Sequence, residues 1–206
     1  MPYLLLLLGC VVFIFSILLL NIEQLQLLDQ ATVTWFGLHR TDILTQFGIV
    51  LSLLGGMPFV LFLSTLWCIC LAWYKKYTSA VFVCVGIFGG IPLAWLLKWS
   101  FARPRPNQSL HLVDSFGNSF PSAHSCYAAC FACLVIYISL QSKRRHFWIG
   151  LAVLWMVVMG ISRIYLGVHF PSDVLSGWSI GFIWISLLYV FWYRHSKTHK
   201  WKKFFR

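Results

Sequence analysis

Six stretches of the chain are apolar over lengths close to the ~20 residues that a helix needs to cross a hydrocarbon core of ~30 Å. Polar or charged residues flank each stretch. Because backbone groups inside a bilayer must be satisfied internally, each stretch is expected to be helical. The predicted spans are approximately residues 4–20, 51–73, 80–97, 122–140, 147–164 and 174–193.

The composition excludes the main soluble alternatives. Of 206 residues, 60% are hydrophobic and 10% charged, whereas soluble domains are roughly 45–50% apolar and about 25% charged. A soluble fold of this length could not bury so much apolar surface. The net charge of +11 would suit a nucleic-acid-binding protein, but the apolar composition would not. The sequence therefore predicts an all-α polytopic membrane protein with six transmembrane helices, a single domain over residues 1–206, and no nucleic-acid partner.

Two regions outside the simple spans have their own pattern. Residues 21–41 place Leu25, Leu28 and further apolar residues at helical spacing, which predicts an amphipathic helix in the membrane interface. The apolar stretch 43–73 is too long for one simple span. Gly55, Gly56 and Pro58 are expected to break it, so that a re-entrant or surface piece precedes the second span.

The N-terminal stretch could instead be a signal peptide. It lacks a basic region before the apolar run and a small-residue cleavage site. The residues before Cys10 resemble a lipoprotein cleavage site, but the apolar run continues well past it. A retained membrane helix is therefore expected.

Small residues inside the spans are interpreted as packing residues. All seven cysteines lie within predicted spans. Cys130 and Cys133 have the spacing of a redox or zinc pair, but no histidine or second pair lies nearby, so a packing role is favoured. Gly177 and Gly181, four residues apart in the last span, could let two helices approach closely.

The distribution of basic residues predicts the orientation. With six spans, one side of the membrane carries eleven Lys and Arg and no acidic residue, in the loops at 75–76 and 143–145 and in the C-terminal tail. The other side carries five basic and five acidic residues. The excess of Lys and Arg marks the cytoplasmic side. Both termini are therefore expected in the cytoplasm, and the balanced side is expected to face outward.

Polar residues gather at the helix ends on this outward side. Charged side chains at membrane depth are energetically costly, so we interpret them first as functional residues. They form three clusters in the sequence: Lys98 with Arg103 and Arg105; Pro121, Ser122 and His124; and Ser162 and Arg163 with His169 and Asp173.

The chemistry of these residues suits phosphate. Lys98, Arg105 and Arg163 match a phosphate dianion, and an arginine can bind two of its oxygens at once. Ser122 begins a helix, whose free N–H groups would add an anion site. A carboxylate such as Asp173 can hold one nitrogen of His169 and leave the other free as nucleophile or base.

The three clusters resemble the signature of the type-2 phosphatidic acid phosphatase superfamily, membrane lipid phosphatases that include phosphatidylglycerophosphatase B-like enzymes. The signature reads K-x6-R-P, P-S-G-H and S-R-x5-H-x3-D. In this chain it corresponds to Lys98…Arg105-Pro106, Pro121-Ser122-Ala123-His124 and Ser162-Arg163…His169…Asp173. The first and third motifs match in full, and the second departs only in having Ala123 where glycine is usual. The resemblance covers the chain from the third span to the sixth.

The resemblance implies a role for each residue. Lys98, Arg105 and Arg163 would hold the phosphate, with help from Ser122 and the N–H of Ala123. His169, oriented by Asp173, would attack phosphorus and form a phosphohistidine, and His124 would protonate the leaving oxygen. Arg103 is a secondary candidate for contact with the phosphate or head group. The family requires no metal or other cofactor, and the sequence shows no carboxylate cluster to bind a metal.

The resulting hypothesis is a lipid phosphatase of a bacterial inner membrane, acting at the outer face on phosphatidylglycerol phosphate, phosphatidic acid or undecaprenyl diphosphate. A phosphotransferase of the same superfamily, with a lipid or sugar acceptor, is the main alternative. A non-enzymatic lipid transporter is more remote, because the charged residues stop at the helix ends. His111 and Asp114 are ordinary surface residues in this interpretation, although either could touch a head group. The sequence does not predict the oligomeric state.

Overall fold

The structure, a computed structural model, describes residues 1–198, and these form eight α-helices and one short 3-10 helix. The all-α prediction is confirmed. The helices are α1 (Pro2–Asn21), α2 (Glu23–Leu38), α3 (Asp42–Leu54), α4 (Met57–Trp73), α5 (Tyr77–Phe101), η1 (Gln108–Leu110), α6 (Ala123–Ser139), α7 (Arg145–Tyr165) and α8 (Pro171–Thr198). Of the tail residues predicted to be cytoplasmic, Lys200, Lys202, Lys203 and Arg206 lie outside the described residues.

The helices have the length and surface of membrane spans. Within residues 1–198, α1, α5, α7 and α8 are long and apolar enough to cross a membrane, and α3 with α4 passes the same test as a pair bent by 57°. Helix α6 is apolar but has only 17 residues. Large apolar side chains point outward, as Leu4, Leu7 and Ile14 do on α1. The chain is therefore an all-helical integral membrane protein with four or five candidate spans, and the count of six stays a prediction.

The second predicted span, 51–73, is wrong at its beginning. Helix α3 continues to Leu54, and α4 begins only at Met57. Gly55 caps α3, Gly56 precedes α4 and Pro58 lies in the first turn of α4. The break therefore falls at the three residues that predicted it, because proline favours the first turn of a helix and disrupts its interior.

Two other helices are longer than the apolar runs that predicted them. Helix α5 was expected over 80–97 and covers Tyr77–Phe101, and α8 was expected over 174–193 and covers Pro171–Thr198. Polar and aromatic residues continue each helix beyond its apolar part. The extra turns matter because they carry Lys98 and Asp173 as parts of regular helices.

Helix α6 is the centre of the bundle. It contacts α4, α5, α7 and α8, and 13 of its 17 residues are buried. Its cysteines Cys126, Cys130 and Cys133 are free thiols in the largest apolar cluster. The packing interpretation of the Cys130–Cys133 spacing is thus confirmed.

The two glycines of α8 allow α6 to pack closely against it. A Cβ atom on Gly177 would lie 2.5 Å from the carbonyl oxygen of Ser122, and one on Gly181 would lie 2.5 Å from Cβ of Ala129. The predicted close helix approach is confirmed. It allows the N–H of Ser122 to donate to the carbonyl of Asp173 over 2.9 Å, so the beginnings of α6 and α8 are joined.

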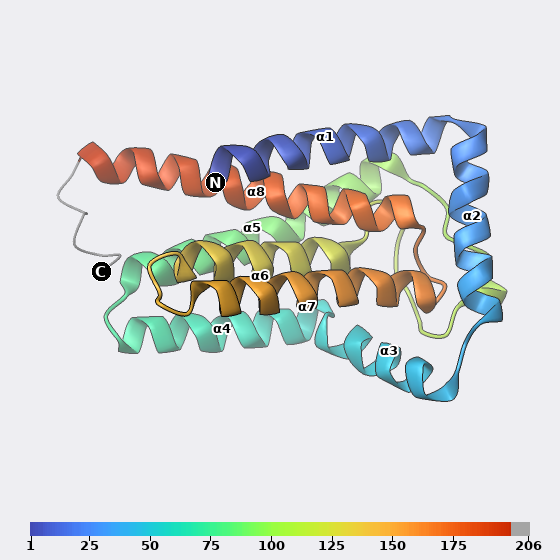
Figure 1. Ribbon diagram of the computed structural model, residues 1–206, viewed down its shortest axis with the longest axis horizontal. Coiled ribbons are helices and arrows are strands. Elements are labelled where there is room, and N and C mark those ends of the chain that lie inside the picture. Colours follow the sequence, from blue (N-terminus) through green and yellow to red (C-terminus); the bar gives the residue numbers. More distant parts are fainter. Residues whose placement is uncertain (199–206) are drawn as a thin grey trace.

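The two ends of the bundle differ (Figure 1). The α4–α5 and α6–α7 turns lie at one end, where α1 also begins. Helix α2, the loop 102–122 and the α7–α8 turn lie at the opposite end, where α2 runs across the long helices. The three sequence clusters of polar residues therefore share the end that α2 covers.

Candidate active site

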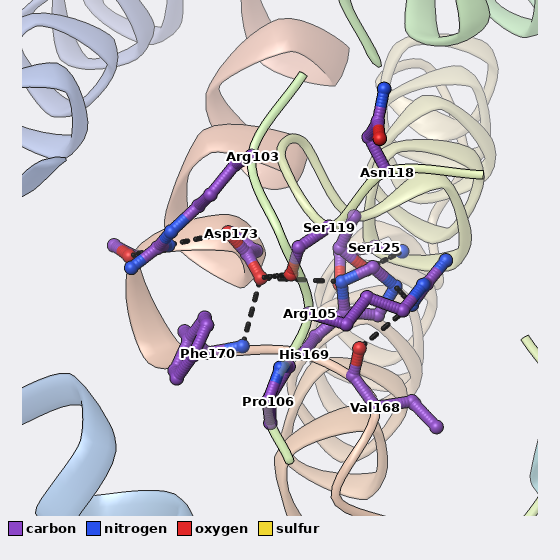
Figure 2. Close-up of polar contacts among 12 residues, drawn as sticks. Arg103, Arg105, Pro106, Asn118, Ser119, Ser125, Val168, His169, Phe170 and Asp173 are labelled. Carbon is purple, nitrogen blue, oxygen red and sulfur yellow. Dashed lines mark hydrogen bonds and ion pairs between the residues drawn. The ribbon is translucent and has the colours of Figure 1, made fainter. Parts of the chain in front are cut away.

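Residues from five different segments meet at this end of the bundle. Lys98 comes from the last turn of α5, Arg105 from the loop after it, His124 from the first turn of α6 and Arg163 from the last turn of α7. His169 lies in the turn before α8, and Asp173 lies in the first turn of α8. Figure 2 shows Arg105, His169 and Asp173 converging, with the loop residue Ser119 beside them.

His169 and Asp173 form a hydrogen-bonded pair. Nδ1 of His169 lies 3.3 Å from Oδ2 of Asp173, and α8 begins between them at Pro171. Because a carboxylate accepts, Nδ1 carries the proton and Nε2 keeps its lone pair. Burial lowers the pKa of His169 to about 3, so its ring is neutral at pH 7. The pair thus has the geometry of a nucleophile with its orienting carboxylate.

The same carboxylate oxygen is held by two further donors. The backbone N–H of Phe170 donates to Oδ2 of Asp173 over 2.8 Å, and the hydroxyl of Ser119 donates to it as well. Ser119 lies in the loop before α6 and is fully buried. Its role was missed from the sequence, because a loop serine outside any motif carries no signal.

Arg105 donates a hydrogen bond to Nε2 of His169, the ring nitrogen that Asp173 does not contact. Its Nη1 lies 3.3 Å from Nε2 of His169 and donates to the carbonyl of Val168 over 2.7 Å. Its other nitrogens donate to the carbonyls of Gly117 and Phe116 over 2.9 and 2.7 Å. Burial lowers the pKa of Arg105, yet arginine remains charged near neutral pH. A guanidinium is therefore fixed where a group attacked by His169 would lie.

Lys98 is almost completely buried and joins α5 to the loop before α6. Its Nζ donates to the carbonyls of Asn118 and Ser119 over 2.5 and 3.3 Å. The side-chain amide of Asn118 donates back to the carbonyl of Lys98 over 3.1 Å. Lys98 also interacts electrostatically with Arg105 and Arg163. It adds positive charge to the site and fixes the position of the loop before α6.

Arg163 is buried with unused hydrogen-bond donors. Its side chain is 1% exposed, and neither Nε nor Nη1 has a partner among the described residues. Leaving such donors buried and unpaired costs about 1–3 kcal/mol each. Both nitrogens belong to one rigid, charged guanidinium, a group that binds phosphate through charge-assisted hydrogen bonds. The site therefore offers an anion two buried, unpaired hydrogen-bond donors.

His124 lies on the other side of this basic cluster. It interacts electrostatically with Arg163, His169 and Lys98. Its Nε2 lies 3.2 Å from the carbonyl oxygen of Ser52 in α3, so the helix break at Gly55 helps to position the ring.

The start of α6 explains why alanine is tolerated in the second motif. Ser122 caps the helix, and its Oγ accepts from the N–H of Ser125 over 3.4 Å. Ala123 is the first helical residue, and it does not have positive φ. A backbone in this conformation does not require glycine. The N–H of Ala123 is thus retained without strain.

Arg103 forms ion pairs with two carboxylates of the protein, those of Asp173 and Asp29. Its Nη1 is 2.6 Å from Oδ1 of Asp173, and its Nη2 is 2.9 Å from Oδ2 of Asp29 in α2. Asp29 is buried, whereas the apolar residues Leu28 and Trp35 of the same helix are exposed. The apolar pattern of α2 therefore gives no sign of this contact in the sequence.

His111 and Asp114 lie in the loop beside this centre. His111 Nε2 is 3.1 Å from the carbonyl oxygen of Pro106, and burial lowers the pKa of His111. Both residues line an open surface hollow that Arg105 also lines. Within residues 1–198, no group of three His, Cys, Asp or Glu residues could hold a metal ion.

Comparisons with known proteins show which family the chain resembles. The PAP2 superfamily model matches residues 73–197. Phosphatidylglycerophosphatase B of Bacillus subtilis is 31% identical over 83% of this chain and 88% of its own length. The lipid A 1-phosphatase of Rhizobium johnstonii is 32% identical over 57% of this chain, and the match covers 48% of that protein.

A solved structure extends the likeness beyond the motifs. The crystal structure of a transmembrane PAP2-type phosphatidylglycerolphosphate phosphatase from Bacillus subtilis superposes with a TM-score of 0.83. The two chains are 27% identical, and the superposition covers 94% of this chain and 98% of the other. The likeness therefore includes the N-terminal helices, where the sequence has no motif.

Proposed function

The chain belongs to the PAP2 superfamily, and from that premise we propose how this membrane lipid phosphatase binds its substrate, which residues react and how it lies in the membrane. It is an integral membrane enzyme that hydrolyses a phosphate monoester or diphosphate of a membrane lipid. Its candidate substrates are phosphatidylglycerol phosphate, phosphatidic acid and undecaprenyl diphosphate.

The observation that carries the proposal is the pair of buried, unpartnered donors on Arg163. Arg163 interacts electrostatically with Lys98 and Arg105, and Arg105 lies 3.3 Å from Nε2 of His169. A phosphate here would satisfy both donors and be balanced by three cations. The N–H of Ala123 lies at the start of α6, the end of a helix that favours anions.

The reaction follows from this placement. The lone pair on Nε2 of His169 forms a bond to phosphorus, and the bond between phosphorus and the lipid oxygen breaks. His124 gives its proton to the leaving oxygen. Water, deprotonated by His124, then attacks the phosphohistidine, releases phosphate and restores His169. The cations stabilise the charge on phosphorus in both steps, so no metal is needed.

An apolar groove beside His124 supports a lipid substrate. The groove has a volume of about 380 Å³ and is lined from α3, α4, α6 and α7, by residues that include Gly55, Val60, Tyr127 and Trp155. Gly55 stands at the reactive end, since a Cβ atom there would lie 3.3 Å from the ring of His124. A hydrocarbon chain in this groove would bring its ester oxygen to the residue that protonates it.

For the membrane arrangement we propose six spans, with the α3–α4 pair and α6 added to the four long helices. Helix α2 lies in the interface. Both termini and the basic turns at 75–76 and 143–145 are cytoplasmic, and the site faces the periplasm or cell exterior. Its support is the charge distribution, together with the separation of basic turns and site at opposite ends of the bundle (Figure 1).

Phosphate release from defined lipids tests the proposal. The purified protein in detergent is expected to release phosphate from lipid monophosphates or polyprenyl diphosphates in the presence of EDTA. His169→Gln should abolish release, while Glu23→Gln, an exposed change on α2, should leave it intact. Loss of activity in EDTA would contradict metal independence. Phosphate recovered on an added lipid or sugar alcohol would favour the phosphotransferase.

A further inference from the structure

A carboxylate that lies far from the three motifs in the sequence is buried against the start of α8. Asp29 lies in the middle of α2 and is 3% exposed. Its Oδ1 accepts from the backbone N–H of Ser172 over 3.1 Å, and its Oδ2 accepts from the hydroxyl of Ser172 and from Arg103. Asp29 therefore caps the first turn of the helix that carries Asp173.

Arg103 connects this carboxylate to Asp173. One terminal nitrogen of Arg103 bonds Asp29 over 2.9 Å, and the other bonds Asp173 over 2.6 Å and the hydroxyl of Ser172 over 2.7 Å. The guanidinium lies 4.2 Å from the ring centre of Phe170 (Figure 2). The planar fork of Arg103 is thus fixed by two carboxylates and a ring face.

These contacts determine how Asp173 meets His169. Arg103 occupies Oδ1 of Asp173, which leaves Oδ2 for Nδ1 of His169. With both oxygens engaged, the carboxylate cannot rotate without breaking hydrogen bonds. Oδ2 therefore stays directed at Nδ1, and the ring of His169 stays in the tautomer with Nε2 free.

We propose that Asp29 is a positioning residue for phosphoryl transfer, which acts through Arg103 and Ser172 to fix Asp173 and, through it, the ring of His169. This inference rests on the proposed function. It makes the interfacial helix α2 part of the catalytic apparatus, although α2 carries none of the family motifs. It also assigns Arg103 to the carboxylates and not to the phosphate.

Kinetics of Asp29→Asn test the proposal, with Glu23→Gln as the matched control. Both changes turn a carboxylate of α2 into an amide, but Glu23 is exposed. Because misplacement by about 1 Å can cost 10²-fold in rate, kcat of Asp29→Asn should fall on the order of 100-fold. KM should stay within about twofold, since Asp29 does not touch the phosphate donors. The control should retain the wild-type kcat.

Two further variants keep the test valid if Asp29→Asn folds poorly. Ser172→Ala leaves Arg103 and both carboxylates in place and removes only the bridging hydroxyl, and it should lower kcat about 10-fold. Asp29→Glu keeps the charge and should recover part of the activity lost in Asp29→Asn. A rise in KM with unchanged kcat, in either Asp29→Asn or Ser172→Ala, would overturn the proposal.

Nitrogen NMR of histidine-labelled protein separates this inference from the proposed function, because it needs no turnover. The His169 signal, assigned by its loss in His169→Gln, should report the Nδ1–H tautomer in the wild type. In Asp29→Asn it should report a mixture of tautomers. A pure Nδ1–H tautomer in both proteins overturns the positioning role, whatever the activity. If the wild type releases no phosphate but the tautomers still differ between the wild type and Asp29→Asn, the proposed function is contradicted and the positioning role is supported.

Discussion

Arg163 has two unpartnered donors on one rigid guanidinium, whereas a lysine at this position would offer phosphate only a single point charge. Arg163→Lys should therefore lower kcat/KM by roughly 10²–10³-fold, the usual cost of losing one donor to a transition-state oxyanion. Arg145→Lys, an exposed change at the start of α7, is the matched control. Phosphate release at varied lipid concentration measures both. Near-normal rates in Arg163→Lys would remove Arg163 from the phosphate site.

The neutral ring of His169 gives stability a defined dependence on pH. Its pKa is about 3 in the folded protein and about 6.5 when unfolded, so between these values the unfolded chain takes up a proton that the folded one does not. Stability is therefore lost as the pH falls below about 6.5, by up to about 1.4 kcal/mol per pH unit. Unfolding in detergent between pH 7 and pH 5 should show a steeper loss in the wild type than in His169→Gln. Parallel curves would contradict a neutral buried ring.

At this scale the sequence could predict residue types but not their partners. Lys98, Arg105, Arg163, His124, His169 and Asp173 were identified from chemistry and motif spacing, and the structure brings them together. Asp29 and Ser119 could not be found in this way. Each contacts Asp173 or its neighbours across a long sequence separation. Only the packing of α2 and of the loop before α6 reveals these contacts.

At the scale of helices, the close packing of α6 and α8 brings His124, in the first turn of α6, near the turn that carries His169 just before α8. A Cβ atom on Gly181 would lie 2.5 Å from Cβ of Ala129, so Gly181→Ala should force the helices apart and cost about 1–3 kcal/mol. Gly150→Ala is the control, because its Cβ would meet nothing within 4 Å. Unfolding in detergent should therefore show Gly181→Ala to be the less stable variant. Equal stability would mean that α6 and α8 can separate without cost.

The helices show where apolar patterns predict well and where they fail. Hydropathy located every long helix, and Gly55, Gly56 and Pro58 predicted the break between α3 and α4. Hydropathy could not predict helix ends, because a helix continues through polar residues when neighbouring groups satisfy them. Lys98 at the end of α5, bonded to two loop carbonyls, is such a case.

At the scale of the whole molecule, the proposed orientation rests on the distribution of the basic residues that give the net charge of +11. The basic turns at 75–76 and 143–145 lie at the end of the bundle opposite the site (Figure 1). Single cysteines at Phe116 and Lys143, both exposed, can test this. A membrane-impermeant thiol reagent should label Phe116→Cys in intact cells and Lys143→Cys only after permeabilisation. The reverse pattern would invert the proposed topology.

The proposed mechanism depends most on His169 as the nucleophile. A lipid carrying radiolabelled phosphate, mixed with the enzyme and quenched in alkali within one turnover, tests this directly. The label should be recovered on the peptide that contains His169, as a phosphohistidine, and should be absent from His169→Gln. Label on another residue, or rapid turnover with no protein-bound phosphate at any time, would contradict the account.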